Sequence, residues 1–128
     1  MQLKTIKQAY LINASSQDVW QALIDPVIID KWGGGPARMD GKVGTSFTLW
    51  GGDIYGKNIN VINGKELKQE WFSGKWKNPS KVTLTLKEKN GRTEISLLHE
   101  DVPNEETKDI DQGWKNYYLG PIKKLLEK

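Results

Sequence analysis

Hydrophobic and polar side chains alternate along the first part of the chain. From Leu3 to Asn13, the side chains of Ile6, Tyr10 and Ile12 fall on one face, and the residues between them fall on the other. A period of two with β-branched residues is typical of a β-strand. We therefore expect a strand over this segment.

The pattern next changes to helical spacing. Val19, Trp20 and Leu23 recur at helical intervals, and Ser15 lies three residues before Asp18. A serine oxygen at that position accepts a hydrogen bond from the first turn, and aspartate there suits the positive end of the helix dipole. The sequence thus predicts a helix that begins after Ser15.

A second, short helix is expected over Val27–Trp32. Asp25 suits its N-cap and Pro26 its first turn, because the missing N–H of proline leaves no donor unpaired there. The run Gly33-Gly34-Gly35 follows directly and is expected to end this helix.

The chain after Pro36 is dominated by strand patterns. Alternation or β-forming residues mark five segments, which are Thr45–Trp50, Asp53–Ile62, Glu66–Phe72, Ser80–Lys89 and Thr93–Asp101. Short turn sequences lie between them, namely Gly51-Gly52, Asn63-Gly64 and Asn90-Gly91. Asn-Gly between apolar runs is a strong hairpin signal, because both turn positions require positive φ. The pattern predicts a meander of antiparallel strands.

One long helix is expected from Asn104, which suits an N-cap, to Lys128. Its apolar residues form a single stripe, made of Ile110, Trp114, Tyr118, Ile122 and Leu125. Pro121 interrupts this pattern and predicts a kink. Helices segregated from a run of antiparallel strands indicate an α+β fold. We expect a sheet of about six strands to curl around the C-terminal helix, with the two short helices closing one end.

Composition narrows the class of protein. A length of 128 residues fits one domain over residues 1–128, and a 37% apolar fraction is enough for a core. The absence of cysteine excludes disulfides, thiolate metal sites and cysteine nucleophiles. The net charge of +3 comes from interleaved bases and acids, which predicts no nucleic-acid binding. No apolar run is long enough for a membrane span or a signal peptide, so we expect a cytoplasmic protein.

The aromatic residues are the most informative candidates for a site. Six tryptophans accompany only two phenylalanines and two methionines. The residues expected to line a cavity between the sheet and the C-terminal helix, and to bind a ligand there, are Trp32, Phe47, Trp71, His99, Trp114 and Tyr118. Gln69 and Asn58 are expected to add polar groups. The same rings also suit a filled core, so both interpretations stay open.

His99 is the only histidine, and it shares a face with Ile95 and Leu97 near a strand end. At the mouth of a cavity it would anchor the polar end of a ligand or act as a general base. A structural histidine satisfied by backbone groups is the alternative. Because no acid, base or nucleophile is paired with it by any motif, we expect no catalytic residues.

No metal or other cofactor is expected either. A metal site needs several donors, and His99 has neither a second histidine nor a thiolate beside it. The acidic residues Glu100, Asp101, Glu105, Glu106, Asp109 and Asp111 lack the spacing of a calcium loop and indicate a solvated helix start. The glycine runs do not lie between a strand and a helix with lysine behind them, so they are not phosphate loops.

An ordered series of motifs covers almost the whole chain. It includes Asp18-Val19-Trp20-Gln21-Ala22-Leu23, Phe47-Thr48-Leu49-Trp50-Gly51-Gly52, Glu70-Trp71, Val82-Thr83-Leu84-Thr85-Leu86, Val102-Pro103, and Gly113-Trp114 with Tyr117-Tyr118. The series resembles the START-like, or SRPBCC, superfamily with its helix-grip fold. Within it, the chain is similar to the C-terminal domain of the activators of Hsp-90 ATPase.

The resemblance and the aromatic residues together lead to three functional hypotheses. The first is a non-enzymatic binding module that holds a small hydrophobic ligand between the sheet and the C-terminal helix. The second, implied by the resemblance, is a protein-interaction module that acts on an Hsp-90-type chaperone. The third is a cyclase-like or hydrolytic enzyme that uses His99.

Overall fold

The computed structural model describes residues 2–74 and 76–127. Its strands are β1 (Leu3–Ile12), β2 (Ser46–Leu49), β3 (Ile54–Ile62), β4 (Glu66–Ser73), β5 (Ser80–Lys89) and β6 (Arg92–Pro103). Its α-helices are α1 (Ser16–Ile24), α2 (Pro26–Trp32), α3 (Thr107–Gly113) and α4 (Gly120–Leu126). Short helical turns η1 (Trp50–Gly52) and η2 (Asn104–Glu106) and a π-helical segment η3 (Trp114–Leu119) complete the order. Most predicted strands differ from the observed ones by a residue or two at their ends.

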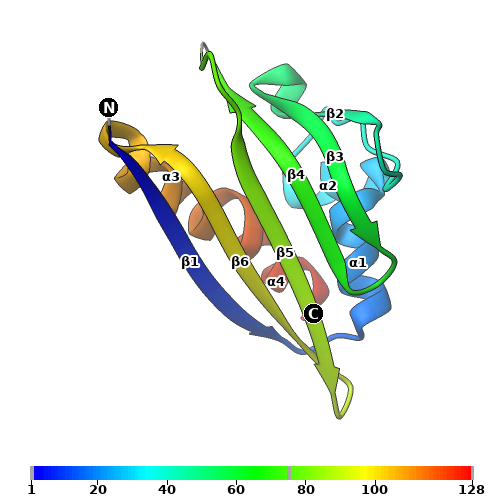
Figure 1. Ribbon diagram of the computed structural model, residues 1–128. Helices are drawn as coiled ribbons and strands as arrows, with labels where there is room; N and C mark the ends of the chain where they lie inside the picture. Colours follow the sequence, from blue (N-terminus) through cyan, green and yellow to red (C-terminus); the bar gives the residue numbers. More distant parts are fainter. Residues whose placement is uncertain (1, 75, 128) are drawn as a thin grey trace.

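The six strands form one antiparallel sheet in the order β1-β6-β5-β4-β3-β2. The strands from β2 to β6 follow one another as the predicted meander, and β1 is added beside β6. Figure 1 shows that the sheet curves and that all helices lie on one of its faces. The fold is therefore α+β of the helix-grip type, as the sequence predicted.

Alternation along the strands decides which side chains face the helices. On β5, the buried residues Ser80, Val82, Leu84 and Leu86 alternate with more exposed ones. The same alternation on β4 and β6 gives a core between the sheet and the helices. Within it, α4 contacts α1 and α2, and α3 contacts β1.

The predicted helix boundaries at the N-terminal end are confirmed. The Ser15 hydroxyl accepts a hydrogen bond from the Asp18 backbone N–H, and the Asp25 carboxylate accepts one from Val27. Gly33 ends α2 with φ of 100°, a conformation that a residue without a Cβ adopts readily.

The turns agree with the prediction at one hairpin and differ at two others. Asn90 and Gly91 both have positive φ, as the two-residue turn requires. At Asn63-Gly64 only the glycine does, and Lys65 donates back to Ile62, so the connection is a longer turn that needs one positive φ. The predicted hairpin turn at Gly51-Gly52 is the helical turn η1.

The C-terminal segment is not the single α-helix predicted from an N-cap at Asn104. It begins with η2 and α3, neither of which has a side-chain cap. The π-helical segment η3 ends directly before Gly120 and Pro121, where the sequence predicted a kink. Pro121 cannot donate to the carbonyl four residues back, and the Gly120 N–H instead donates to Lys115, five residues back. A Cβ on Gly120 would clash with that backbone carbonyl oxygen, so glycine fits there.

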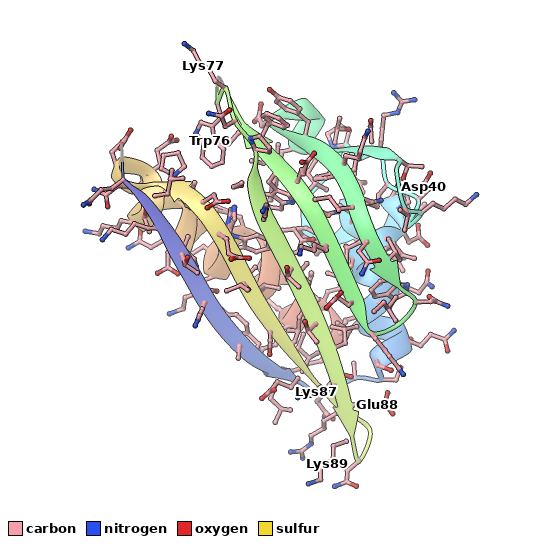
Figure 2. All side chains as sticks on the ribbon, in the orientation of Figure 1. Asp40, Trp76, Lys77, Lys87, Glu88 and Lys89 are labelled. Atoms are coloured by element: carbon pink, nitrogen blue, oxygen red, sulfur yellow. The ribbon has the colours of Figure 1, made fainter. Side chains whose placement is uncertain are left out.

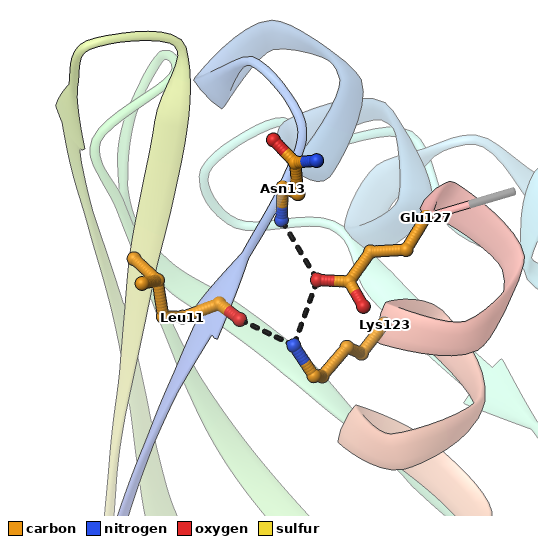
Figure 3. Close-up of polar contacts among 4 residues, drawn as sticks. All are labelled: Leu11, Asn13, Lys123 and Glu127. Atoms are coloured by element: carbon orange, nitrogen blue, oxygen red, sulfur yellow. Dashed lines mark hydrogen bonds and ion pairs between the residues drawn. The ribbon is translucent and has the colours of Figure 1, made fainter.

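A set of polar contacts, which we call the Lys123 clip, fastens α4 to the end of β1 (Figure 3). The Lys123 ammonium donates to the Leu11 carbonyl at 2.6 Å and pairs with Glu127 at 2.7 Å. Glu127 in turn accepts from the Asn13 backbone N–H at 2.9 Å.

Among the described residues, no helix is long and apolar enough to cross a membrane.

Candidate functional site

An open cleft of about 470 Å³ separates the start of the C-terminal segment from the sheet. We call it the aromatic cleft. Its walls are formed by Trp50, Asp53, Ile54, Trp71 and Ser73 on the sheet side, and by Glu106, Asp109, Ile110, Gly113, Trp114, Tyr117 and Tyr118 on the helix side. It lies at the end of the molecule where Figure 2 labels Trp76, whose indole N–H donates to Glu106 at 2.6 Å.

Stacked aromatic rings form the inner part of this cleft. The rings of Trp71 and Trp114 lie 4.7 Å apart between centroids and 20° from parallel, and both residues are buried. The Tyr118 ring lies 4.5 Å from that of Trp114. Tyr117 is 66% exposed and stands at the rim. The cleft therefore has a fixed aromatic inner wall and at least one aromatic side chain open to solvent.

Strand register explains how Trp71 reaches this position. Phe47, Gly56, Trp71 and Ser80 lie opposite one another in a row across β2, β3, β4 and β5. A Cβ on Gly56 would lie 3.1 Å from the Phe47 ring and much closer to the Glu70 carbonyl. The bare backbone of Gly56 thus leaves room for the large rings beside it.

The glycine runs position a further ring of the cleft. Trp50 has φ of 48°, a left-handed conformation that is rare for a bulky residue. Its backbone N–H donates to Gly34 at 2.7 Å, and the Gly51 N–H donates to Pro36 at 2.9 Å. Strained residues of this kind persist where surrounding contacts enforce them, often at binding sites. Both glycine runs therefore belong to the support of Trp50.

His99 lies behind the stacked rings and is fully buried. The Trp114 indole N–H donates to its Nδ1 at 2.9 Å, and its Nε2 lies 2.7 Å from the Ser80 hydroxyl. Because an indole can only donate, Nδ1 carries no proton, and the neutral ring has its proton on Nε2. Nε2 then donates to Ser80, which donates to the Trp71 carbonyl at 3.1 Å. Burial lowers the pKa of His99 to about 4, which keeps it neutral.

This arrangement does not form a nucleophile and base. A serine nucleophile needs an imidazole nitrogen that accepts its proton, but the nitrogen facing Ser80 is already protonated. Both side chains are also fully buried. The Ser80–His99 contact is a structural one that supports the stacked tryptophans.

A second set of buried polar groups continues from the cleft toward the other end of β3. The Trp71 indole donates to Gln69 at 2.8 Å, and Gln69 donates to Asn58 at 2.8 Å. Asn58 donates to the Thr45 hydroxyl at 3.2 Å. The Thr45 hydroxyl in turn donates to the Asp40 carboxylate at 2.6 Å. The Thr45 hydrogen bond holds the pKa of Asp40 below its usual range. Gln69 and Asn58 thus satisfy one another rather than facing the cleft.

Two buried polar atoms have no hydrogen-bond partner among the described residues. They are the Trp20 indole nitrogen and the Tyr118 hydroxyl. Burial raises the pKa of Tyr118, so the phenol stays protonated. An unpaired buried hydroxyl destabilises the folded state, and here it belongs to a residue of the cleft wall.

The structure brings some of the predicted site residues together and separates others. Trp71, Trp114 and Tyr118 line the aromatic cleft. Trp32 and Phe47 are buried beneath it, where Trp32 packs 4.7 Å from Tyr118. The prediction that His99 lies at the cavity mouth is wrong, because the two stacked tryptophans contact its ring from the cleft side. The expectation that backbone groups satisfy His99 is also wrong, since side chains do so.

Sequence reasoning missed several residues of the cleft wall. Trp50 was assigned to a strand end, although a large ring before two glycines also marks a loop that presents it. Tyr117 lies outside the apolar stripe and received no role. Asp109 does lie in the first turn of α3, as a solvated helix start requires, and it lines the cleft as well.

Within the described residues, no group of three or more His, Cys, Asp or Glu could hold a metal ion.

The curved sheet, the helices on its concave face and the cleft between them define a START-like domain of the helix-grip class. A family model described as "Activator of Hsp90 ATPase homolog 1-like protein" matches residues 13–127, and the chain belongs to that family. The family is named for activation of another protein's ATPase.

Curated relatives extend beyond the region that this chain matches. The human and mouse proteins named "Activator of 90 kDa heat shock protein ATPase homolog 1" are each 25% identical over 124 residues. That alignment covers 95% of this chain but 36% of either relative. The chain therefore spans about a third of the length of these proteins.

Solved structures agree with the fold. An HSP90 activator from Plasmodium falciparum superposes with a TM-score of 0.87 at 22% identity, covering 95% of each chain. The Aha1 dimer from Colwellia psychrerythraea gives 0.83 at 20% identity, covering 97% and 96%. DynU16, from the dynemicin biosynthetic locus, gives 0.85 at 20% identity and covers 97% of this chain and 47% of its own. At these identities the likeness establishes the fold alone.

Proposed function

We propose that residues 1–128 act as a non-enzymatic binding domain that holds a small hydrophobic molecule in the aromatic cleft. The cleft itself is the observation that supports this function. Five aromatic side chains surround about 470 Å³, a volume in the range of small-molecule sites, with a few polar groups at the edge. The ligand-binding residues are then Trp50, Trp71, Trp114, Tyr117 and Tyr118, with Trp32, Phe47 and His99 as supports beneath them.

Ligand mapping by NMR tests this proposal. A panel of flat aromatic and fatty compounds should shift the indole N–H signals of Trp71 and Trp114 and the amides of η3. Native mass spectrometry of the freshly purified protein should detect any molecule that remains bound. If no compound perturbs these signals at millimolar concentration, the small-molecule function is wrong.

A matched pair of substitutions distinguishes binding in the cleft from non-specific adsorption to exposed aromatic side chains. Tyr117→Ala removes an exposed ring at the cleft rim, and Tyr55→Ala removes an exposed ring on β3 that stacks on Phe72 outside the cleft. We expect the first change to weaken binding and the second to leave it unchanged. Equal effects would indicate non-specific adsorption to aromatic surface.

A second candidate function is regulation of an Hsp90-type chaperone. It is favoured by the relatives named as activators of that ATPase, which match along nearly the whole chain. It requires a cytoplasmic location, as expected from the sequence. The ATPase rate of such a chaperone, measured with increasing amounts of this protein and with Tyr117→Ala, tests it. An unchanged rate at saturating protein contradicts this second function and leaves the first intact.

A further inference from the structure

The charged side chains that the described residues contribute to the wall of the aromatic cleft all have one sign. The described residues of its wall include the carboxylates of Asp53, Glu106 and Asp109 and no lysine, arginine or histidine. The whole chain, in contrast, has 19 basic and 16 acidic residues. A basic protein thus presents an acidic rim at the aromatic cleft, and the charge of this rim is opposite to the net charge of the chain.

Of these three carboxylates, Glu106 accepts a hydrogen bond from the Trp76 indole, and the other two have no side-chain partner among the described residues. Among residues 2–74 and 76–127, neither Asp53 nor Asp109 makes a side-chain hydrogen bond or an ion pair, and both are exposed. Asp53 follows η1 on the sheet side, and Asp109 lies in α3 on the helix side. A molecule in the cleft would therefore meet a carboxylate on either wall.

The aromatic groups between the two aspartates favour the same charge. The face of an indole or phenol ring carries negative partial charge and attracts cations, most strongly for tryptophan. Trp50, Trp71 and Trp114 supply three indoles to the cleft wall. Trp50 is partly buried and Tyr117 is 66% exposed, so these two rings are open to a molecule in the cleft, in front of the stacked Trp71 and Trp114. An anion would instead meet ring faces and carboxylates that repel it.

From this combination we propose that the ligand of the aromatic cleft is a small organic cation, with its positive charge on an amine or quaternary ammonium next to an apolar or flat group. The apolar group lies against the stacked Trp71 and Trp114, and the charge lies toward Asp53 and Asp109. This inference rests on the proposed small-molecule function and specifies the chemical class of the molecule.

Three probes of one shape and different charge test the inference. They are (4-hydroxyphenyl)trimethylammonium, its neutral carbon analogue 4-tert-butylphenol, and 4-hydroxybenzenesulfonate. Each is titrated into the full chain while the indole N–H signals of the tryptophans are followed by NMR. We expect the cation to bind about tenfold more tightly than the neutral analogue and the sulfonate not to bind. Raising the salt concentration should weaken binding of the cation only.

Charge removal provides the matched variants. The double substitution Asp53→Asn with Asp109→Asn keeps the shape of the cleft and should bring the affinity for the cation to within about twofold of that for 4-tert-butylphenol. Glu94→Gln removes an exposed carboxylate on the opposite face of β6 from buried Ile95 and should change neither affinity. Thermal unfolding of both variants confirms that they fold.

The outcomes separate this inference from the function on which it rests. If the neutral analogue binds in the cleft as tightly as the cation, the cleft binds small molecules but the charge preference is wrong. Preference for the sulfonate, or full affinity of the double variant for the cation, also overturns the inference. If none of the probes shifts the cleft tryptophans and the wider hydrophobic panel fails as well, the small-molecule function itself is wrong.

Discussion

The two halves of the C-terminal helical segment are held to the sheet in different ways. In the second half, α4 buries Ile122, contacts α1 and α2, and is fastened to β1 by the Lys123 clip. In the first half, α3 has no buried residue and no side-chain cap. The π-helical segment η3 between them buries Trp114, Tyr118 and Leu119 in the core. The first half is tied to β1 at the surface, where the Gln8 amide donates to the Asp111 carbonyl at 2.8 Å and to its carboxylate at 2.7 Å. The cleft opens where α3 buries no side chain of its own.

The two halves of the C-terminal segment therefore have different roles. A tightly fastened α4 fixes the position of the segment, so the first half does not need to close against the sheet. The predicted stripe of Trp114, Tyr118 and Ile122 is buried in the core, although part of it lies on the π-helical segment. Tyr117, on the same segment, stands at the cleft rim beside the buried Tyr118.

Trp114→Ala should be the most damaging change. It removes a ring that is 2% exposed, stacked on Trp71 and hydrogen bonded to His99, and it leaves a cavity. We expect the free energy of unfolding in urea to fall by about 3–5 kcal/mol. Tyr117→Ala, at an exposed aromatic position of the same turn, is the control and should have an effect of about 0.5 kcal/mol. A loss below about 1 kcal/mol for Trp114→Ala would mean that this ring does not anchor the helix.

Acid should weaken the cleft half through His99. Its pKa is lowered by burial from 6.5 to about 4, so below pH 6.5 the unfolded chain binds a proton that the folded chain does not. The stability from this residue is complete above pH 6.5 and is lost as the pH falls toward 4. From these values the loss at pH 4 is roughly 3 kcal/mol.

Unfolding curves between neutral pH and pH 4 measure this loss. The variant His99→Gln isolates it, because carboxylates such as Asp40 titrate in both proteins. If the wild-type and His99→Gln slopes are equal, the histidine is not held neutral by the fold. An NMR titration of the His99 ring protons gives the same answer directly.

Sequence reasoning predicted features that depend on neighbouring residues and missed features that depend on residues far apart in the chain. Ser15, Asp25 and Asn90-Gly91 act on their own turns, and their roles were predicted correctly. The α+β architecture followed from the order of periodic segments, as did the burial of Trp114. The burial of His99 depends instead on Ser80 and Trp114, which come from another strand and from the helix. Periodicity gives the face of a residue but does not reveal which side chains cover that face.

The aromatic cleft shows the same limit. Trp71, Trp114 and Tyr118 could be predicted because they lie on apolar faces of regular elements. Trp50 could not, since its position depends on a left-handed backbone held by Gly34. Asp53 and Asp109 reach the cleft from separate segments, and nothing in their local sequence distinguishes them from solvated acids.

Tyr118→Phe should act in the opposite direction to Trp114→Ala. The ring remains packed between its aromatic neighbours, and only the unpaired buried hydroxyl is removed. We expect the free energy of unfolding to rise by about 1 kcal/mol, because no hydrogen bond is lost. Tyr10→Phe is the matched control, since the Tyr10 hydroxyl donates to Gln8 at 2.7 Å, and it should be neutral or destabilising. A destabilised Tyr118→Phe protein would mean that this hydroxyl has a partner in solution.

Loosening the clipped half should have the smallest effect on global stability. Lys123→Met keeps most of the apolar stem of the side chain and removes its contacts with Leu11 and Glu127. Those contacts are at the surface, where ion pairs contribute little, so the unfolding midpoint should move less than in any change above. The local effect should be clear, because Lys123 and the Asn13 backbone N–H both bind the Glu127 carboxylate. The hydrogen bond from Lys123, and after it the one from Asn13, lowers the pKa of Glu127. We expect faster amide hydrogen exchange at Asn13 and in the last turn of α4, with the indole signals of Trp71 and Trp114 unchanged. If those two signals shift as well, the two halves of the segment are coupled and the clip also sets the shape of the cleft.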